Sequence, residues 1–292
     1  MVHTSQSRIM RASLPVGWML PLVLALFAGM PNAQAQTPSP LQEWQYSSGI
    51  LLRQMFEPNV PTWQTTVGAS VSWQPLYDGA KTYRVMPGPA IDIRYKNLAF
   101  VSMGSGIGVN VLRGDNYRAG IAVTYDLGRR VADYPSHLHG LGNISPAPVV
   151  KLFASYALSK AFPLVLRADL RRVIGGANGW VGDVGAYMPL PGSSKSFFMF
   201  AGPSITLASG DYMQNEFGVD AIQSLHSGYP QFQAGGGLKS IGFGFTANWF
   251  ITSQWLLNGN AAVSRLLGAA ADSPITEQRT QGTVNLTVAY LF

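Results

Sequence analysis

Beyond residue 35, three histidines and one serine are the side chains whose spacing could support chemistry. His137 and His139 are separated by a single residue, Ser136 precedes them, and His226 stands apart. A His-x-His pair on a strand would direct both rings to one side and could bind a metal ion, whereas a serine beside a histidine suggests a hydrolase at a barrel rim. No third ligand has a spacing that singles it out, and the flanking proline and glycine favour a solvated loop. We therefore predict no catalytic residue and no metal site.

Two glycine-rich stretches, 104–108 and 235–237, are similar in composition to phosphate-binding loops. Neither precedes a helical pattern or a Lys-Ser/Thr pair, so both are better explained as glycine that relieves crowding in a curved sheet. The chain also has no cysteine, which excludes disulfides, thiolate metal sites and cysteine nucleophiles. We predict that the protein has no cofactor.

The first 35 residues have the pattern of a secretory signal peptide. Two arginines precede an apolar stretch at 14–30, and Ala-Gln-Ala at 33–35 is a small-x-small cleavage site. A retained membrane anchor is the alternative, but proline and glycine interrupt the apolar stretch. We predict cleavage of residues 1–35 and a mature chain that begins near Gln36.

The composition points to a chain that does not meet water over its whole outer surface. Of its 292 residues, 47% are hydrophobic and only 12% are charged, about half the charge of a typical soluble domain. The net charge of +6 is not gathered into a basic arm, so the composition argues against nucleic acid as a partner. After the leader, no apolar run reaches the roughly eighteen residues that a membrane helix needs.

The apolar residues instead recur with a period of two, which predicts β-strands with one apolar face. The clearest run alternates Leu164, Leu166, Ala168 and Leu170 with Arg167, Asp169 and Arg171. In a soluble sandwich the apolar face would point inward, whereas in a membrane barrel it meets lipid and the polar face lines the lumen.

Three features favour the membrane barrel. The strand segments are near the length that crosses a bilayer at a tilt, and aromatic residues collect at strand ends as interfacial girdles do. These aromatics are Trp63, Trp73, Tyr95, Trp180, Tyr187, Trp249, Trp255 and Tyr290. The chain also ends on an alternating strand whose Tyr290 and Phe292 resemble the targeting signal of bacterial outer-membrane barrels. We predict an all-β transmembrane barrel at 63–292 in the outer membrane of a Gram-negative bacterium, in contact with outer-membrane lipid, lipopolysaccharide and the barrel-assembly machinery.

Eleven strands can be read directly: 64–74, 85–95, 98–111, 117–126, 148–158, 163–173, 180–189, 196–208, 238–250, 254–266 and 282–292. Single-chain bacterial barrels have an even number of strands, so we predict twelve, with ten as the alternative. The missing strand is sought at 231–237 or at 44–55, and residues 36–62 are otherwise a segment in the periplasm or the lumen. The connections at 127–147, 209–237 and 268–280 are long and polar, as the outer loops of such barrels are.

The polar faces of these strands place nine charges in the predicted lumen. They are Asp92, Arg94, Arg118, Asp126, Lys151, Arg167, Asp169, Arg171 and Asp183. Five positive and four negative groups in a narrow space favour pairing, because an unpaired buried charge is costly. The pattern therefore predicts a salt-bridged lumen, and the alternative is a pore with a slight preference for anions.

Several motifs resemble the MipA/OmpV family of outer-membrane proteins. A Pro-x-Tyr-x-Gly turn at 75–79 is followed by a Pro-x-Pro strand start at 87–89. Further similar stretches lie at 91–95, 106–110, 138–142, 175–179, 211–213, 217–219 and 271–275. This sequence departs from the family pattern at Ala80, where serine is frequent, and at His139, where arginine is usual.

The resemblance implies a barrel of about twelve strands without accepted catalytic residues. One member of the family is a scaffold between a murein-degrading transglycosylase and a murein synthase, and others are tied to osmotic response, adhesion or antibiotic susceptibility. We therefore expect a non-enzymatic scaffold for periplasmic murein enzymes. The alternatives are a narrow small-solute channel with weak anion preference and, less favoured, a rim hydrolase or an adhesin.

Overall fold

The computed structural model describes residues 62–158, 164–194 and 196–292. The predicted signal peptide, the segment 36–61 and the candidate strand at 44–55 lie outside the described residues.

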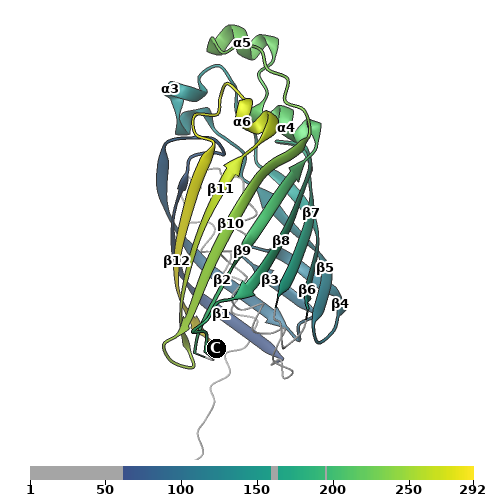
Figure 1. Cartoon of the computed structure of the whole chain (residues 1–292), viewed down its shortest axis with the longest axis vertical. Coiled ribbons are helices and arrows are strands. Elements are labelled where there is room, and N and C mark those ends of the chain that lie inside the picture. Colours follow the sequence, from purple (N-terminus) through teal and green to yellow (C-terminus); the bar gives the residue numbers. More distant parts are fainter. Residues whose placement is uncertain (1–61, 159–163, 195) are drawn as a thin grey trace, which may run out of the picture. The chain divides into compact units, whose positions relative to one another are not determined.

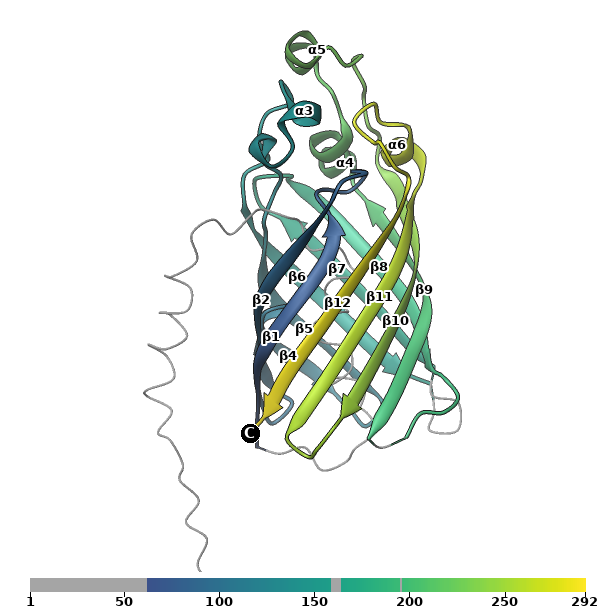
Figure 2. The same cartoon turned by 90° about the vertical axis from the view of Figure 1, so that its left-hand side faces the viewer.

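Twelve antiparallel strands form a closed up-and-down barrel in which each strand pairs with its neighbours in sequence and β1 closes the ring against β12 (Figures 1 and 2). The strands are β1 (Trp63–Pro75), β2 (Tyr83–Tyr95), β3 (Ala99–Ser102), β4 (Gly106–Arg113), β5 (Tyr117–Asp126), β6 (Ala147–Ala157), β7 (Val165–Val173), β8 (Gly179–Pro189), β9 (Phe197–Ala208), β10 (Gly237–Phe250), β11 (Trp255–Leu266) and β12 (Thr280–Leu291). The predicted barrel class and the count of twelve are confirmed.

The count reaches twelve because one segment that the sequence pattern predicts as a single strand forms two strands. The segment predicted as one strand at 98–111 is the hairpin β3–β4, which turns at 103–105 and resumes at Gly106 with φ at +81°. The placement of the missing strand at 231–237 was wrong, because that stretch holds only an isolated bridge between Phe232 and Val219. Alternating apolar residues run through both β3 and β4, so the period alone did not reveal the turn.

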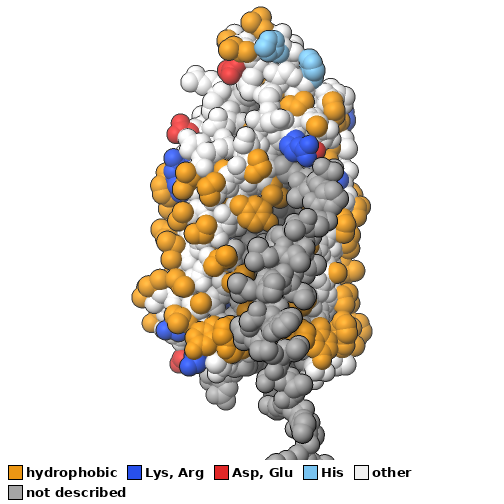
Figure 3. All heavy atoms as spheres, turned by 180° about the vertical axis from the view of Figure 1, so that it is seen from behind, with side chains coloured by type: hydrophobic (Ala, Val, Ile, Leu, Met, Phe, Trp, Pro, Cys, Tyr) orange, Lys and Arg blue, Asp and Glu red, His pale blue; other side chains and the backbone are white. Residues whose placement is uncertain are grey.

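The two faces of the wall differ sharply in polarity. On β1, Val67, Val71 and Trp73 are exposed on the outside, while Ser70 and Ser72 are buried inside. Figure 3 shows hydrophobic side chains over the wall seen from behind, with charged side chains mainly near the two ends. This is the inverse of a soluble barrel and suits an outer surface in lipid.

Aromatic contacts mark both ends of the wall. Trp63 and Tyr95 lie 4.7 Å apart between ring centroids at one end, and Trp73 stacks on Tyr83 at 4.1 Å near the other. The two pairs are about ten residues apart along β1, the length that a tilted strand needs to cross a bilayer. Tyr187 was wrongly assigned to this girdle: its ring is buried inside the barrel with Phe198 and Phe200, because it falls on the inward-facing positions of β8.

The long connections all gather at one end of the barrel and fold into short helices, visible at the top of Figure 1. They are η2 (Val131–Asp133), α3 (Pro135–Leu138), α4 (Gly210–Phe217), α5 (Ala221–Ser227) and α6 (Gly268–Asp272). The C-terminus and the short turns lie at the opposite end. In outer-membrane barrels the long loops face outward and the short turns face the periplasm. None of the described helices has both the length and the apolarity to cross a membrane.

Leu170 faces lipid near the middle of β7 and is 42% exposed, next to Leu152 of β6. We predict that Leu170→Arg lowers the free energy of unfolding by about 2 to 4 kcal/mol, because a cation near the bilayer midplane is poorly solvated. Leu158→Arg, just past the periplasmic end of β6, should cost about 1 kcal/mol or less. Urea-induced unfolding in lipid vesicles measures both, and equal costs would contradict the depth assigned to Leu170.

Candidate functional site

The lumen of the barrel holds an ion-pair cluster on β7 and β8. The Arg171 guanidinium donates to Asp183 at 2.5 Å and also lies 3.4 Å from the Asp169 carboxylate. The second oxygen of Asp183 accepts from the Thr206 hydroxyl at 2.6 Å. Register explains the cluster, because Asp169 and Asp183 are direct cross-strand partners and Arg171 is two residues along on the same inner face.

A second ion pair forms within one strand. Arg94 donates two hydrogen bonds to the carboxylate of Asp92, at 2.6 and 2.7 Å, and both residues are buried. The pair is bidentate, which is the strongest geometry for arginine and carboxylate. The Arg94 guanidinium also lies over the ring of Phe100 at 5.6 Å from its centroid. The cation is therefore held by a carboxylate and an aromatic face together.

The nine charges predicted for the lumen all lie on five strands. Asp92 and Arg94 are on β2, Arg118 and Asp126 on β5, Lys151 on β6, Arg167, Asp169 and Arg171 on β7, and Asp183 on β8. Arg167 is half-buried and the other eight are buried. The structure brings Asp169, Arg171 and Asp183 into one cluster and Asp92 and Arg94 into another, while Asp126 accepts from the backbone N–H of Gly128 at 2.7 Å.

The opposite wall lines the lumen with uncharged polar groups. Thr246 donates to Asn260, Asn260 donates to Asn258, and Asn258 donates to Asn248 at 2.8 Å. Asn285 of β12 is also buried on this side. This amide network was not predicted from the sequence, although the asparagines at alternate positions of an apolar strand were a signal for it. Because its members bond one another, the network adds interior contacts without adding net charge.

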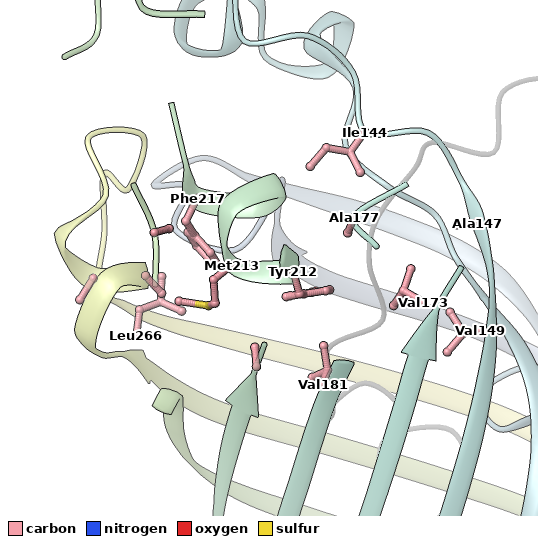
Figure 4. Close-up of a cluster of buried hydrophobic side chains, with 14 residues drawn as sticks. Ile144, Ala147, Val149, Val173, Ala177, Val181, Tyr212, Met213, Phe217 and Leu266 are labelled. Atoms are coloured by element: carbon pink, nitrogen blue, oxygen red, sulfur yellow. The ribbon is translucent and has the colours of Figure 1, made fainter. Parts of the chain in front are cut away.

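The outer mouth of the barrel is covered by α4. Tyr212, Met213 and Phe217 are each no more than 2% exposed, and they pack against Leu266 and Val181 at the strand ends (Figure 4). The helix begins at Ser209, whose side chain accepts from the backbone N–H of Tyr212.

We refer to α4 and its buried side chains as the cap. An ion pair lies next to the cap. Lys239, at the start of β10, donates to Asp78 in the β1–β2 turn at 2.6 Å, and its ammonium lies 5.4 Å from the ring centroid of Tyr212. Lys239 was not among the residues predicted from the sequence, although a charge between the outward-facing Leu238 and Ile241 was a signal for it.

Glu216 is a buried carboxyl within this cap. Burial, reinforced by Asp126 and Asp78, raises the pKa of Glu216 to about 7, and Arg129 and Lys239 oppose the shift. The Arg129 guanidinium bonds the backbone carbonyl of Glu216 at 2.6 Å. Within the described residues, one oxygen of the Glu216 carboxyl has no hydrogen-bond partner. The cap therefore contains a buried carboxyl whose pKa lies near neutral pH.

His137 lies among aromatic side chains of the outer loops. His137 stacks near Tyr77 and Tyr134, and its Nδ1 lies 2.8 Å from the Tyr229 hydroxyl and 3.8 Å from the Glu277 carboxylate. His137 lies on α3, whereas the exposed His139 follows the last residue of this helix and has non-helical backbone angles.

His226 and Ser136 are also exposed. No group of three metal-ligating side chains is present in the described part of the chain.

Tyr290 and Phe292, predicted to direct barrel targeting, lie at the periplasmic end of β12. Tyr290 packs edge-on against Trp255 at 5.3 Å and against Phe292 at 4.9 Å between ring centroids. The backbone N–H of Phe292 donates to the carbonyl of Thr65 at 2.9 Å, across the β1–β12 closure. Their role in targeting stays a prediction.

A twelve-stranded outer-membrane barrel with an ion-paired, polar lumen wall and a helical cap is the class that this fold and interior define. Residues 67–292 match the model of a protein family described as "MltA-interacting protein MipA". This chain belongs to that family. No curated protein matches it closely.

Solved structures with a similar arrangement are outer-membrane barrels. An outer-membrane channel from Pseudomonas putida F1 is 9% identical, with 80% of this chain and 97% of that chain covered and a TM-score of 0.41. The CymD monoaromatic hydrocarbon channel is 10% identical over 91% of this chain and 96% of its own, with a TM-score of 0.39. The translocator domain of the autotransporter NalP from Neisseria meningitidis is 13% identical over 85% and 99%, with a TM-score of 0.38. These likenesses are too distant to assign this chain a ligand or a partner.

The Asp183 cluster allows a test of how the lumen is stabilised. We predict that Asp183→Leu lowers the free energy of unfolding by about 3 to 5 kcal/mol, because Arg171 loses its shortest partner inside the barrel. Adding Arg171→Met should recover part of that loss. Urea-induced unfolding in vesicles measures both, with the exposed Asp115→Asn as a control that should change little. A double variant that is less stable than the single one would contradict the pairing.

The cap should respond to pH through Glu216. Its raised pKa means that its protonated form stabilises the cap, so this contribution is complete below about pH 4.5 and is lost as the pH rises through about 7. We predict faster hydrogen exchange in α4 at pH 8.5 than at pH 5.5, after correction for the intrinsic rate, and no such change in Glu216→Gln. The control Glu277→Gln alters a carboxyl whose pKa is lowered. In this variant, the change in the hydrogen exchange of α4 between pH 5.5 and pH 8.5 should therefore remain.

Proposed function

We propose that this protein is a non-enzymatic outer-membrane scaffold that holds a murein transglycosylase of the MltA type at its periplasmic end. The observation that supports this most is the interior: ion pairs and amides occupy the lumen wall, and α4 covers the outer mouth. A general porin needs about sixteen strands to leave an aqueous channel. The interior is thus organised for rigidity, which suits an anchor, and the family description supplies the kind of partner.

The periplasmic turns offer a firm and charged surface for such a partner. Lys96 and Asn97 turn the chain between β2 and β3 with φ at +46° and +51°, and the Asn110 side chain holds the turn by donating to the Asn97 carbonyl at 2.8 Å. Lys96 and Arg113 are exposed at this end. Since a rigid surface loses little entropy on binding, these turns can contribute affinity from few contacts.

The proposal is tested with the purified barrel in lipid nanodiscs and a purified transglycosylase of the MltA type. We expect saturable binding that weakens at least tenfold in the double variant Lys96→Glu with Arg113→Glu. The matched control, Lys81→Glu with Arg279→Glu, makes the same charge change at the outer end and should bind normally. Absence of binding to the unaltered barrel would refute the proposal.

Conductance in planar bilayers separates the scaffold from the narrow channel. A filled lumen predicts small or rare steps, whereas large and steady conductance would favour the channel.

A further inference from the structure

The barrel wall is interrupted between β2 and β5 in its outer half. β3 has only four residues and pairs with β2 from Asp92 to Tyr95, so within the described residues the stretch 83–91 of β2 pairs with β1 alone. On the other side, β4 pairs with β5 only as far as Val123, and 124–126 pair with β6 alone. The result is a gap above the tip of the β3–β4 hairpin, and we refer to it as the lateral gap.

The lateral gap lies at membrane depth. Its β2 edge runs between the aromatic pair Trp73–Tyr83 at the outer end and Tyr95 at the periplasmic end. Unpaired backbone groups at this depth are costly, because lipid tails offer them no hydrogen bonds. A free edge here needs a partner that supplies such bonds.

The edge of β2 has a specific polarity. The carbonyl of Ile91 accepts from the backbone N–H of Met103, so the odd-numbered residues of β2 direct their peptide groups into the gap. Pro87 and Pro89 occupy two of these positions and have no N–H. An added β-strand would find no donor at these two positions, and Val85 would be the nearest odd-numbered residue toward the outer end with an N–H. The edge therefore offers carbonyl acceptors to a ligand that carries O–H or N–H donors.

The surroundings of the gap divide by polarity. On the lipid side, Val101, Ile107 and Val123 are exposed, and they also line an apolar groove of about 600 Å³ that continues toward Tyr95. On the lumen side, Gly88 and Ser70 keep the wall thin: a Cβ added at Gly88 would meet only the Ser70 hydroxyl, at 3.7 Å.

The rim of the gap holds two further polar features. The Ser102 hydroxyl at its base is buried without a partner in the described residues. An ion pair between Arg84 and Asp133, at 3.5 Å, spans its top.

We propose that the lateral gap is a binding site for a single-chain amphiphile of the outer leaflet. Hydroxyl or amide donors of its uncharged head bond the carbonyls of Val85, Pro87 and Pro89, while its alkyl chain lies in the groove beside Val101 and Ile107. The acceptors lie in the outer half of the wall, and the groove runs from the base of the gap toward the periplasmic aromatic pair Trp63–Tyr95, so the alkyl chain extends from the head toward the inner half of the bilayer. With the axial mouth covered by α4, this opening is the side on which the barrel meets such a molecule.

The absence of cysteine allows a direct test by site-specific labelling. Two single variants, Val101→Cys in the groove and Val263→Cys at an exposed position of the fully paired β11, are each labelled with bimane in the full-length barrel in lipid vesicles. The probe is dodecanol with a nitroxide near its terminal methyl group. We expect saturable quenching of the label at position 101, at least twofold greater than at position 263, and competition by unlabelled dodecanol.

The matched probe, the methyl ether of the same alcohol, tests the need for a donor without any change in the protein. With this ether, the excess quenching of the label at position 101 should disappear. Val123→Phe in the same background should also remove that excess by narrowing the groove, and Val123→Leu serves where the larger residue prevents insertion. Equal quenching at the two labelled positions, weaker quenching at position 101, or an unchanged signal with the ether would each overturn the proposal.

Discussion

Backbone hydrogen bonding in lipid is the constraint on which the rest of this structure depends. A strand in the bilayer must pair on both edges, since no water is present to satisfy its N–H and C=O groups. Pairing of β1 with β12 from Thr66 to Trp73 closes the ring and removes the two edges that an open sheet would leave. The alternating pattern, the inward charges and the aromatic ends all follow from a wall that is closed on itself.

Closure turns every second side chain inward and so fixes what the lumen must contain. Charges brought inside cannot be solvated as they are at a surface, and they are stabilised by partners such as those of Arg171 and Arg94. The asparagines of β10 to β12 meet the same requirement without charge. Contacts of this kind link neighbouring strands of the wall on its inner face.

The cap and the lateral gap are the two departures from a regular barrel. In the cap, α4 covers the mouth with aromatic side chains and a buried acid, and Lys239 links it to the β1–β2 turn through Asp78. At the gap, the loss of strand pairing leaves no unpaired N–H at Pro87 and Pro89, because proline has no backbone N–H. In the part of the chain that the structure describes, α4 thus lies over the outer mouth, and the wall lacks strand pairing between β2 and β5 in its outer half.

The sequence by itself determined the barrel, its two faces and its approximate strand count, because a period of two depends only on the order of residues along the chain. It also placed Asp169, Arg171 and Asp183 on one inner face. Their contacts needed the tertiary structure, because the register of β7 against β8 decides which groups meet across strands.

The split of 98–111 into two strands was equally hidden, since apolar alternation continues on both sides of the turn. The separation of His137 from His139 followed from a short helix where a strand would have aligned them. The burial of Glu216, the cap and the lateral gap arise from segments far apart in sequence. Only their arrangement in space sets the desolvation, pairing and exposure on which their chemistry depends.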